Sequence, residues 1–302
     1  MSARAGLPRE DGAGGAFVRL GRANWVNSAA LIGIHGGAGL AFWTGISRPA
    51  AIAALVVYWT EIFGLSAGYH RYFAHRSFKT SRGFQLVLAI LGAIPAQMGP
   101  LWWSSYHRRH HADADGPGDV HSPRQDGLAW AHVGWVLHAN SAEMDPSYVR
   151  DWLSYPELRW LDRMRWVPPL AVIGSLAALG YWLGGTSQGS AAGALQMVVV
   201  GFFLPTALCY QVTFCVNSIG HRFGRRRFET ADDSRNVAWL ALLTNGEGWH
   251  NNHHRFPSSE KHGFAWWELD LTHYLLRGLE SLGVVWSLRT QSMRSISMET
   301  VP

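Results

Sequence analysis

The stretch Trp249-His250-Asn251-Asn252-His253-His254 decides how the rest of this 302-residue chain is organised. Its histidine spacing occurs a second time, at His107, His110 and His111. On an α-helix, residues three and four apart share a face, so each triplet is predicted to aim three imidazoles at one point, where they can hold a metal ion. A looser pair, His70 and His75, is about 140° out of line on a regular helix, so we expect a helix end or a kink there.

The composition around these histidines indicates a membrane protein. Apolar residues make up 48% of the chain and charged residues only 16%, against about 25% charged residues in a typical soluble domain. Runs that carry at most one charged residue, and that are each about long enough to cross roughly 30 Å of hydrocarbon, span residues 27–47, 50–68, 166–184 and 191–217. The segment 83–100 is apolar but short and is broken by Pro95, Gln97 and Pro100, so we expect an interfacial or partly inserted helix.

Basic residues predict the orientation of the four runs. They gather before the first and third runs and after the second and fourth, whereas the tips of the two hairpins carry only Arg48. The basic residues at the other ends are Arg19, Arg22, Arg71, Arg76, Lys79, Arg82, Arg159, Arg163, Arg165 and Arg222 to Arg227. By the positive-inside tendency, both termini and all histidine clusters are cytosolic, at the cytoplasmic membrane if the protein is bacterial.

The fold class expected from these patterns is an all-α integral membrane protein. Four transmembrane helices in two hairpins carry a cytosolic helical cap, residues 70–165 and 218–290, with a histidine-rich dimetal site. A disordered leader, residues 1–24, precedes a single membrane domain, residues 25–302. Glu61, inside the second run, either supports the metal site from the protein interior or lies at a helix end near water.

A ninth histidine, His221, follows Asn217 by four residues, so both would share a helix face and reach the same centre. Nine imidazoles are too many for one ion that takes four to six ligands, so two metals are implied. Imidazole suits zinc, copper, iron or nickel; the membrane setting and the absence of an obvious hydrolytic nucleophile favour iron.

The two cysteines, Cys209 and Cys215, have no metal-binding spacing. The net charge of +5 comes from arginines beside apolar runs without a nucleic-acid motif, so no nucleic-acid partner is expected.

Taken in order, these patterns resemble the membrane-bound fatty acyl desaturases, specifically the acyl-CoA Δ9 (stearoyl-CoA) type. That family has a first box of two histidines with four residues between them, two boxes of the form His-x-x-His-His, and an extra Asn-x-x-x-His element. The matching residues, within a resemblance that extends from about the first span to Trp267, are His70 and His75; His107, His110 and His111; Asn217 and His221; and His250, His253 and His254.

The resemblance implies a non-haem di-iron centre that is held by those nine histidines, with Asn217 contributing through a bound water. It implies an oxygen-dependent oxidoreductase that introduces a cis double bond into a saturated acyl chain. The acyl chain would arrive as a CoA thioester and lie in a kinked tunnel under the metals. Gln97, Trp103 and Thr213 stand at the offsets of the residues that line that kink. Their other interpretation is ordinary packing at the membrane interface.

Reduction of dioxygen to water during desaturation takes two further electrons. The chain has no cytochrome b5 haem motif, flavin fingerprint or cysteine cluster, so we expect a separate donor of the ferredoxin, rubredoxin or cytochrome b5 type with its reductase. Four arginines after the fourth run either dock that donor or the phosphates of CoA, or only set the topology: Arg222, Arg225, Arg226 and Arg227.

Other chemistries on the same scaffold stay open. Alkane hydroxylases commonly have three residues between the histidines of the first box, so the four residues here favour desaturation over hydroxylation. Oxidative decarboxylation to a terminal alkene would use the same ligands. A non-catalytic metal transporter would bury its ligands midway along the spans, whereas these clusters lie at span ends.

Residues outside the boxes are expected to have mostly supporting roles. His121, beside Asp119, is the strongest candidate to support the metal site. The remaining histidines are His35, His132, His138, His262 and His273. Asp113 and Asp115, close behind the second box, either orient its imidazoles or solvate a loop.

Overall fold

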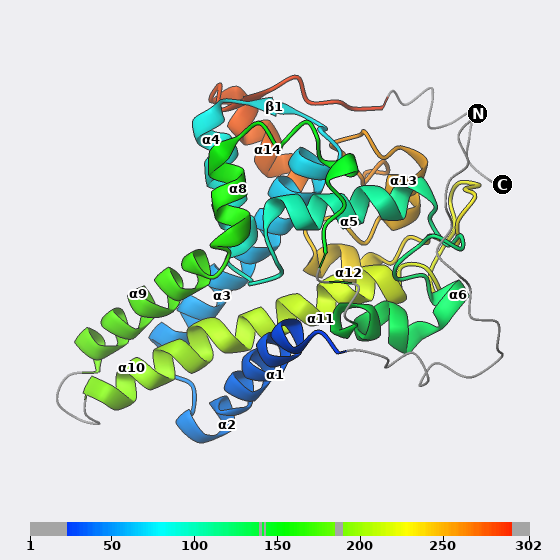
Figure 1. Cartoon of the computed structure of the whole chain (residues 1–302). Helices are drawn as coiled ribbons and strands as arrows, with labels where there is room; N and C mark the ends of the chain where they lie inside the picture. The colour runs from blue at the N-terminus through cyan, green and yellow to red at the C-terminus, as the bar shows by residue number, and fades with distance from the viewer. Residues whose placement is uncertain (1–22, 139–140, 142, 185–189, 292–302) are drawn as a thin grey trace.

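The computed structural model describes residues 23–138, 141, 143–184 and 190–291, so the predicted leader lies almost entirely outside the described residues. The chain is mostly helical, as the sequence predicts, and the apolar helices run together toward one end of the molecule (Figure 1). The helices of the predicted spans are α1 (Trp25–Gly39), α2 (Ala41–Thr44), α3 (Arg48–Phe63), η1 (Gly64–Ala74), α9 (Val167–Leu183), α10 (Ser190–Val198), η5 (Val199–Phe203) and α11 (Leu204–Ser218).

Two of the four predicted spans are helices long and apolar enough to cross a membrane. They are Arg48–Ala74, of 27 residues, and Ser190–His221, of 32 residues. The third predicted span, α9, meets α8 (Pro156–Arg163) at a bend of 65°, and the two count as a third crossing if they are taken as one span. The first is divided between α1 and the short α2, and it remains a prediction.

These helices expose apolar side chains on their outer faces. Exposed examples are Phe42, Trp43, Leu55, Trp182 and Leu208. A belt of this kind is what contact with lipid requires, since water would leave so large an apolar surface unfavourably hydrated. Between α9 and α10 the backbones approach so closely that a Cβ atom on Gly180 would lie 2.4 Å from the carbonyl oxygen of Gly193, which is typical of small residues between membrane helices.

The cap is built from short helices and one small strand pair. Its elements are β1 (Lys79–Thr80), α4 (Arg82–Ala93), α5 (Pro100–Ala112), α6 (Pro123–Asp126), η2 (Trp130–Gly134), α7 (Trp135–Leu137), η4 (Pro146–Tyr148), α8, α12 (Ala238–Leu243), α13 (His250–Arg255), α14 (Leu271–Ser281) and β2 (Val285–Trp286). Strand β1 pairs antiparallel with β2. As expected from Pro95 and Pro100, α4 is apolar but short and ends before α5 begins.

The predicted irregularity between His70 and His75 is a π-helical segment, η1, that ends at Ala74. The amide of His75 donates to the carbonyl of His70 over 3.1 Å, five residues back. Because a π turn takes more residues than an α turn, residues five apart lie closer in rotation than on an α-helix. The two imidazole centroids are therefore only 4.8 Å apart.

Two charged residues have surroundings that the sequence did not indicate. Arg71, assigned to the basic cluster at the end of the second span, is fully buried in the cap. Its guanidinium lies 3.0 Å from both Glu247 and Asp270. Glu61 faces the protein interior, as expected, and is fully buried. It does not lie at a helix end, because the helix continues to Ala74, and its carboxylate accepts a hydrogen bond from Thr206 of α11 over 2.6 Å.

Candidate metal centre

The structure brings all nine box histidines together in two groups. The five-histidine cluster contains His70, His75, His107, His111 and His253. The four-histidine cluster contains His110, His221, His250 and His254. Within each cluster the candidate ligand nitrogens all lie within 4.8 Å of one another.

The prediction that each triplet aims at one point is wrong. Both triplets are helical as expected, on α5 and α13, but His110 leaves the five-histidine cluster and His253 leaves the four-histidine cluster. The reason is the 100° step of the helix, which turns the second histidine of each triplet about 60° to one side of the first and the third about 40° to the other. Because α5 and α13 face each other, the histidines of each helix are therefore divided between the two clusters.

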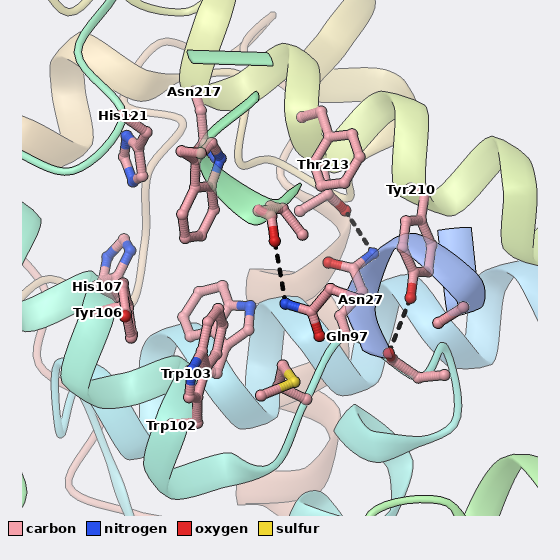
Figure 2. Close-up of a pocket in the computed structure, with 16 residues that line it drawn as sticks. Asn27, Gln97, Trp102, Trp103, Tyr106, His107, His121, Tyr210, Thr213 and Asn217 are labelled. Atoms are coloured by element: carbon pink, nitrogen blue, oxygen red, sulfur yellow. Dashed lines mark hydrogen bonds between the residues drawn. The ribbon is translucent and has the colours of Figure 1, made fainter. Parts of the chain in front are cut away.

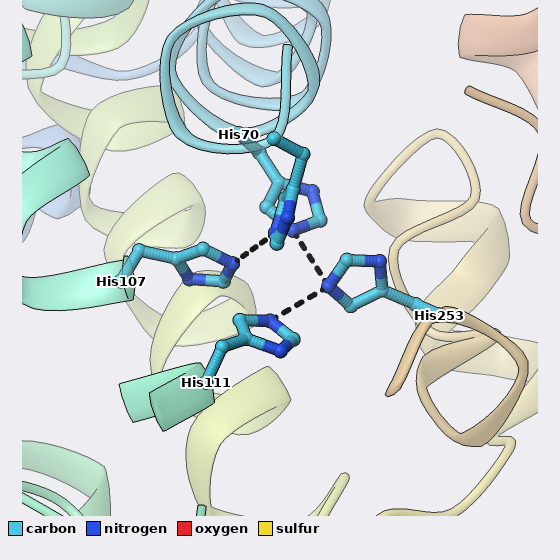
Figure 3. A group of neighbouring side chains, drawn as sticks. His70, His107, His111 and His253 are labelled. Carbon is cyan, nitrogen blue, oxygen red and sulfur yellow. Dashed lines mark hydrogen bonds between the residues drawn. The ribbon is translucent and has the colours of Figure 1, made fainter. Parts of the chain in front are cut away.

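In the five-histidine cluster the imidazoles converge through their Nε2 atoms (Figure 3). The Nε2–Nε2 separations are 2.7 Å between His75 and His107, 3.1 Å between His70 and His253, and 2.9 Å between His111 and His253. Two nitrogens that each coordinate one ion at about 2.0–2.1 Å lie roughly 3 Å apart, so these separations fit a shared metal.

The four-histidine cluster converges in the same way. The Nε2 of His250 lies 2.9 Å from that of His221 and 3.1 Å from that of His254, and the Nε2 atoms of His110 and His254 are 3.4 Å apart. The Nδ1 atoms of His110 and His254 each face a carboxylate, of Asp119 at 3.0 Å and Asp232 at 2.9 Å. In the neutral imidazole the Nδ1–H then donates to the carboxylate, so both Nε2 atoms present lone pairs to each other, and a cation between them satisfies both.

Two further carboxylates lie against histidines: Asp115 is hydrogen-bonded to His221, and Glu247 forms a close ion-pair contact with His70. Asp115 lies 2.7 Å from His221 Nδ1, and Glu247 lies 2.5 Å from His70 Nδ1. Burial alone would raise the pKa of Asp115, but its hydrogen bonds to His221 and Ser122 lower that pKa to about 2. Burial would likewise raise the pKa of Asp119, but His110 and His121 hold it well below its ordinary value. Both groups are therefore ionised at neutral pH and accept the imidazole proton.

The electrostatics of the remaining imidazoles also suit metal binding. Burial, followed by the proximity of the other histidines, lowers the pKa well below its ordinary value for each of His75, His107, His111, His250 and His253. Neutral imidazole is the form that coordinates a metal. The residues present thus fit two metal ions.

Two cavities lie beside the clusters and share part of their lining. Both are lined by Trp103, His107, Thr213 and Asn217. The first continues toward Asn27, Gln97, Tyr210 and Phe214 (Figure 2). The second continues toward Ile62, Leu65, His70, Val216 and His250. Together they form a largely apolar passage that runs past ligands of both clusters.

The predicted kink residues all lie on this passage. Gln97 is flanked by two residues with left-handed backbone, Ala96 at φ 57° and Met98 at φ 72°, a strained geometry that is concentrated at functional sites. Its amide donates to the hydroxyl of Thr213 over 3.5 Å (Figure 2). The indole of Trp103 stacks on the imidazole of His107 at 5.0 Å between centroids. Whether these residues bind substrate stays a prediction.

The four arginines after the last span differ in their surroundings. Arg227 pairs with Glu268 at 2.9 Å, and Arg226 donates to the backbone carbonyl of Asp232 over 3.0 Å. Arg222 and Arg225 are exposed. Of these four arginines, only Arg222 and Arg225 are therefore exposed to a partner in solution.

Among the other candidates, His121 lies 3.7 Å from Asp119, and its ring is tilted against that of His110 with centroids 4.4 Å apart. Asp115 orients an imidazole, that of His221 rather than one of the second box, whereas Asp113 accepts from the amide of Gly118 in its own loop. Of the other histidines outside the boxes, His132 forms hydrogen bonds with Ser218 and Gln211, away from both clusters.

Sequence reasoning missed Asp232 and Glu247. Each lies in a loop, without periodicity to indicate its direction, and Glu247 is separated from His70 by most of the chain. His262, which the sequence analysis grouped with the histidines in supporting roles, does lie beside the site: its Nδ1 is 3.3 Å from Glu247 and its ring centroid is 4.6 Å from that of His253. The signal that was available is proximity in sequence, since Glu247 is three residues before His250.

Comparison with known proteins relates this arrangement to lipid chemistry. A family model described as fatty acid desaturase matches residues 46–289. An sn-1 stearoyl-lipid 9-desaturase of Anabaena variabilis is 36% identical over 269 residues, covering 88% of this chain and 94% of that protein. A hex-5-enoyl-acyl carrier protein acetylenase of Moorena producens is 37% identical, with 85% and 82% covered. An acyl-CoA 5-desaturase of Anemone leveillei is 33% identical, with 83% and 73% covered.

Proposed function

Since this chain belongs to the fatty acid desaturase family, we propose that it is an oxygen-dependent desaturase that introduces a cis double bond into a saturated acyl chain at a centre of two iron ions. The nine histidines of the two clusters are the ligands in this proposal, and Asn217, on the wall of both cavities, contributes through water. The relatives named as 9-desaturases support a Δ9-type regiochemistry.

The observation that carries the proposal is the passage formed by the two cavities, which share Trp103, His107, Thr213 and Asn217 beside the ligands. Its second half is lined by His70 and His107 of the five-histidine cluster and by His110 and His250 of the four-histidine cluster. An acyl chain that fills both halves presents an internal carbon pair to the two ions. In a decarboxylase the carboxyl end of the fatty acid would lie at the metals, so a single cavity beside them would be enough to hold the acyl chain.

When bound, two iron ions would supply the oxidising chemistry that dioxygen activation requires. Two hydrogens leave the acyl chain, and with two electrons and two protons from outside they reduce one dioxygen to two waters. The chain's own residues place the substrate: the apolar lining excludes water, and Trp103, Thr213 and Gln97 define where the chain bends. Selectivity then follows from proximity and orientation of one carbon pair.

For the acyl carrier we propose a membrane glycerolipid in place of the CoA thioester expected from the sequence. The relatives include proteins named for acyl-lipid, acyl carrier protein and acyl-CoA substrates, so their names do not decide the matter. Among the described residues that line the two cavities there is no lysine or arginine. Recognition of the phosphates of CoA would call for such cations, whereas a neutral ester that enters from the bilayer would not.

The proposed setting is a membrane protein of four spans, with α1 and α2 as the fourth crossing and with both termini and the metal centre in the cytosol. A separate electron donor delivers two electrons per turnover. For its docking we propose the exposed Arg222 and Arg225, because Arg226 and Arg227 are already engaged within the protein.

The test is gas chromatography with mass spectrometry of lipids and volatiles from a host that co-expresses the protein with ferredoxin and its reductase. We expect a new internal monoene with intact protein and none with His253→Ala. His132→Ala, which removes a histidine outside both clusters, should still form the product. A terminal alkene, a hydroxy acid or an alkyne in its place would reassign the reaction to decarboxylation, hydroxylation or acetylenation.

The carrier is tested with purified protein and a chemical or enzymatic reductant. Stearoyl groups are offered either as phosphatidylglycerol in vesicles or as stearoyl-CoA. Conversion of the vesicle lipid without hydrolysis supports the lipid carrier, whereas conversion of stearoyl-CoA alone contradicts it.

A further inference from the structure

The two histidine clusters differ in how their imidazoles are supported. In the four-histidine cluster three of the four rings place Nδ1 against a carboxylate: His110 on Asp119, His221 on Asp115 and His254 on Asp232. In the five-histidine cluster only His70 does so, on Glu247, as far as the described residues extend.

The carboxylates also differ in their own surroundings. Glu247 is shared between His70 and the guanidinium of Arg71 at 3.0 Å, which offsets much of its charge. Asp115 accepts from the hydroxyl of Ser122 and the amide of Asp233, and Asp232 accepts from the amide of Ser234; these donors carry no charge. The four-histidine cluster therefore lies within a larger negative potential, which attracts a cation more strongly.

Solvent access differs in the same direction. The side chains of His110, His221 and His254 are only 1–2% exposed. In the five-histidine cluster, His75, His107 and His111 are partly exposed. Water and competing chelators thus reach the five-histidine cluster more easily.

We propose that the two metal positions are unequal: the four-histidine cluster binds its ion first and holds it more tightly, and the five-histidine cluster loads last and exchanges. The inference rests on the proposed dimetal function. Its physical basis is that a carboxylate on Nδ1 orients the ring and increases the donor strength of Nε2. Asp115, Asp119 and Asp232 act in it as positioning residues, without touching the metal.

The first experiment removes one cluster at a time from the full chain. Metal-free protein in detergent is titrated anaerobically with Fe²⁺, and the ions retained against graded chelator are counted by mass spectrometry. The intact protein should lose its two ions in steps at least about tenfold apart in affinity. His75→Ala should leave one tightly held ion, and His250→Ala should leave one weakly held ion.

The second experiment uses variants that preserve the size of the side chain. Asp232→Asn should weaken the tighter step about 10–100-fold, the usual effect of removing such a support, and leave the weaker step unchanged. Glu247→Gln should weaken only the looser step. Asp233→Asn is the matched control: it removes a charge next to Asp232, but its side chain lies 3.8 Å from Arg124 and contacts no histidine, so neither step should move.

Two ions released in one step of equal affinity would overturn the inference, as would a tightly held ion in His250→Ala or equal effects of Asp232→Asn and Asp233→Asn. These outcomes leave the proposed desaturase intact. Protein that binds no iron at all would overturn both the inference and the proposed function.

Discussion

Replacing Arg71 by methionine should strongly destabilise the cap, because this side chain neutralises two buried acids. Arg71 lies in η1, next to His70, and is fully buried. Its guanidinium donates to Asp270 over 3.0 and 3.2 Å and to Glu247 over 3.1 Å, and it also reaches the backbone carbonyl of Glu260. Methionine would fill much of the space but donate no hydrogen bond.

The magnitude follows from the burial of the partners. Breaking a buried ion pair by removing one member costs about 3–5 kcal/mol, because the other charge remains desolvated and unpaired. A change of 1 kcal/mol shifts the unfolding temperature of a domain of 150–250 residues by roughly 2–4 °C. Arg71→Met should therefore lower the unfolding temperature by about 6 °C or more.

The assay is thermal unfolding of purified protein in detergent, followed by circular dichroism. Arg76→Met is the matched control, because Arg76 is half exposed and pairs with Asp151 at the surface. Exposed pairs contribute about 0–1 kcal/mol, so the control should shift by about 4 °C at most. Adding Asp270→Asn to Arg71→Met should recover part of the loss by removing one unpaired charge. Equal shifts for Arg71→Met and Arg76→Met would refute the reasoning.

Three further outcomes are expected. Burial lowers the pKa of His254 from 6.5 to about 4 in the metal-free protein. Between these pH values the unfolded chain therefore binds more protons than the folded chain, so the stability that is complete above about pH 6.5 is lost as the pH falls toward 4. An unfolding temperature of the chelated protein that stays constant over this interval would contradict this expectation. Chelation should abolish product formation, and Fe²⁺ but not Zn²⁺ should restore it, since zinc has no redox chemistry; recovery with zinc would exclude dioxygen activation. Gly92→Ala should lower the free energy of unfolding by about 1–3 kcal/mol through overpacking, because the added Cβ atom would lie 2.2 Å from the ring of Tyr69, which packs on Trp103. Gly83→Ala is the control: its Cβ atom would meet only the hydroxyl of Ser81, at 4.0 Å, so this variant should lower neither stability nor activity.

The sequence by itself was sufficient for the features that depend on local periodicity. Histidines three and four residues apart predicted helical ligand sets on α5 and α13, and both helices are present. The unfavourable spacing of His70 and His75 predicted a helix irregularity, which is the π-helical η1. Uncharged runs predicted membrane helices, and two of the four satisfy the length and hydropathy that a span requires. These features follow from the rotation and rise of a helix, which each short segment carries in its own residues.

Only the tertiary structure decided how the histidines are shared between two ions and which carboxylates orient them. His253 joins the cluster of His70, which is 183 positions away, and His110 joins that of His254, which is 144 positions away. Arg71 reads as a surface cation at the end of a span, yet it is buried because Glu247 and Asp270 arrive from distant loops. Helical periodicity tells which side chains share a face, but not which face of another element lies opposite, because that depends on how the α3–η1, α5, α11 and α13 helices pack together.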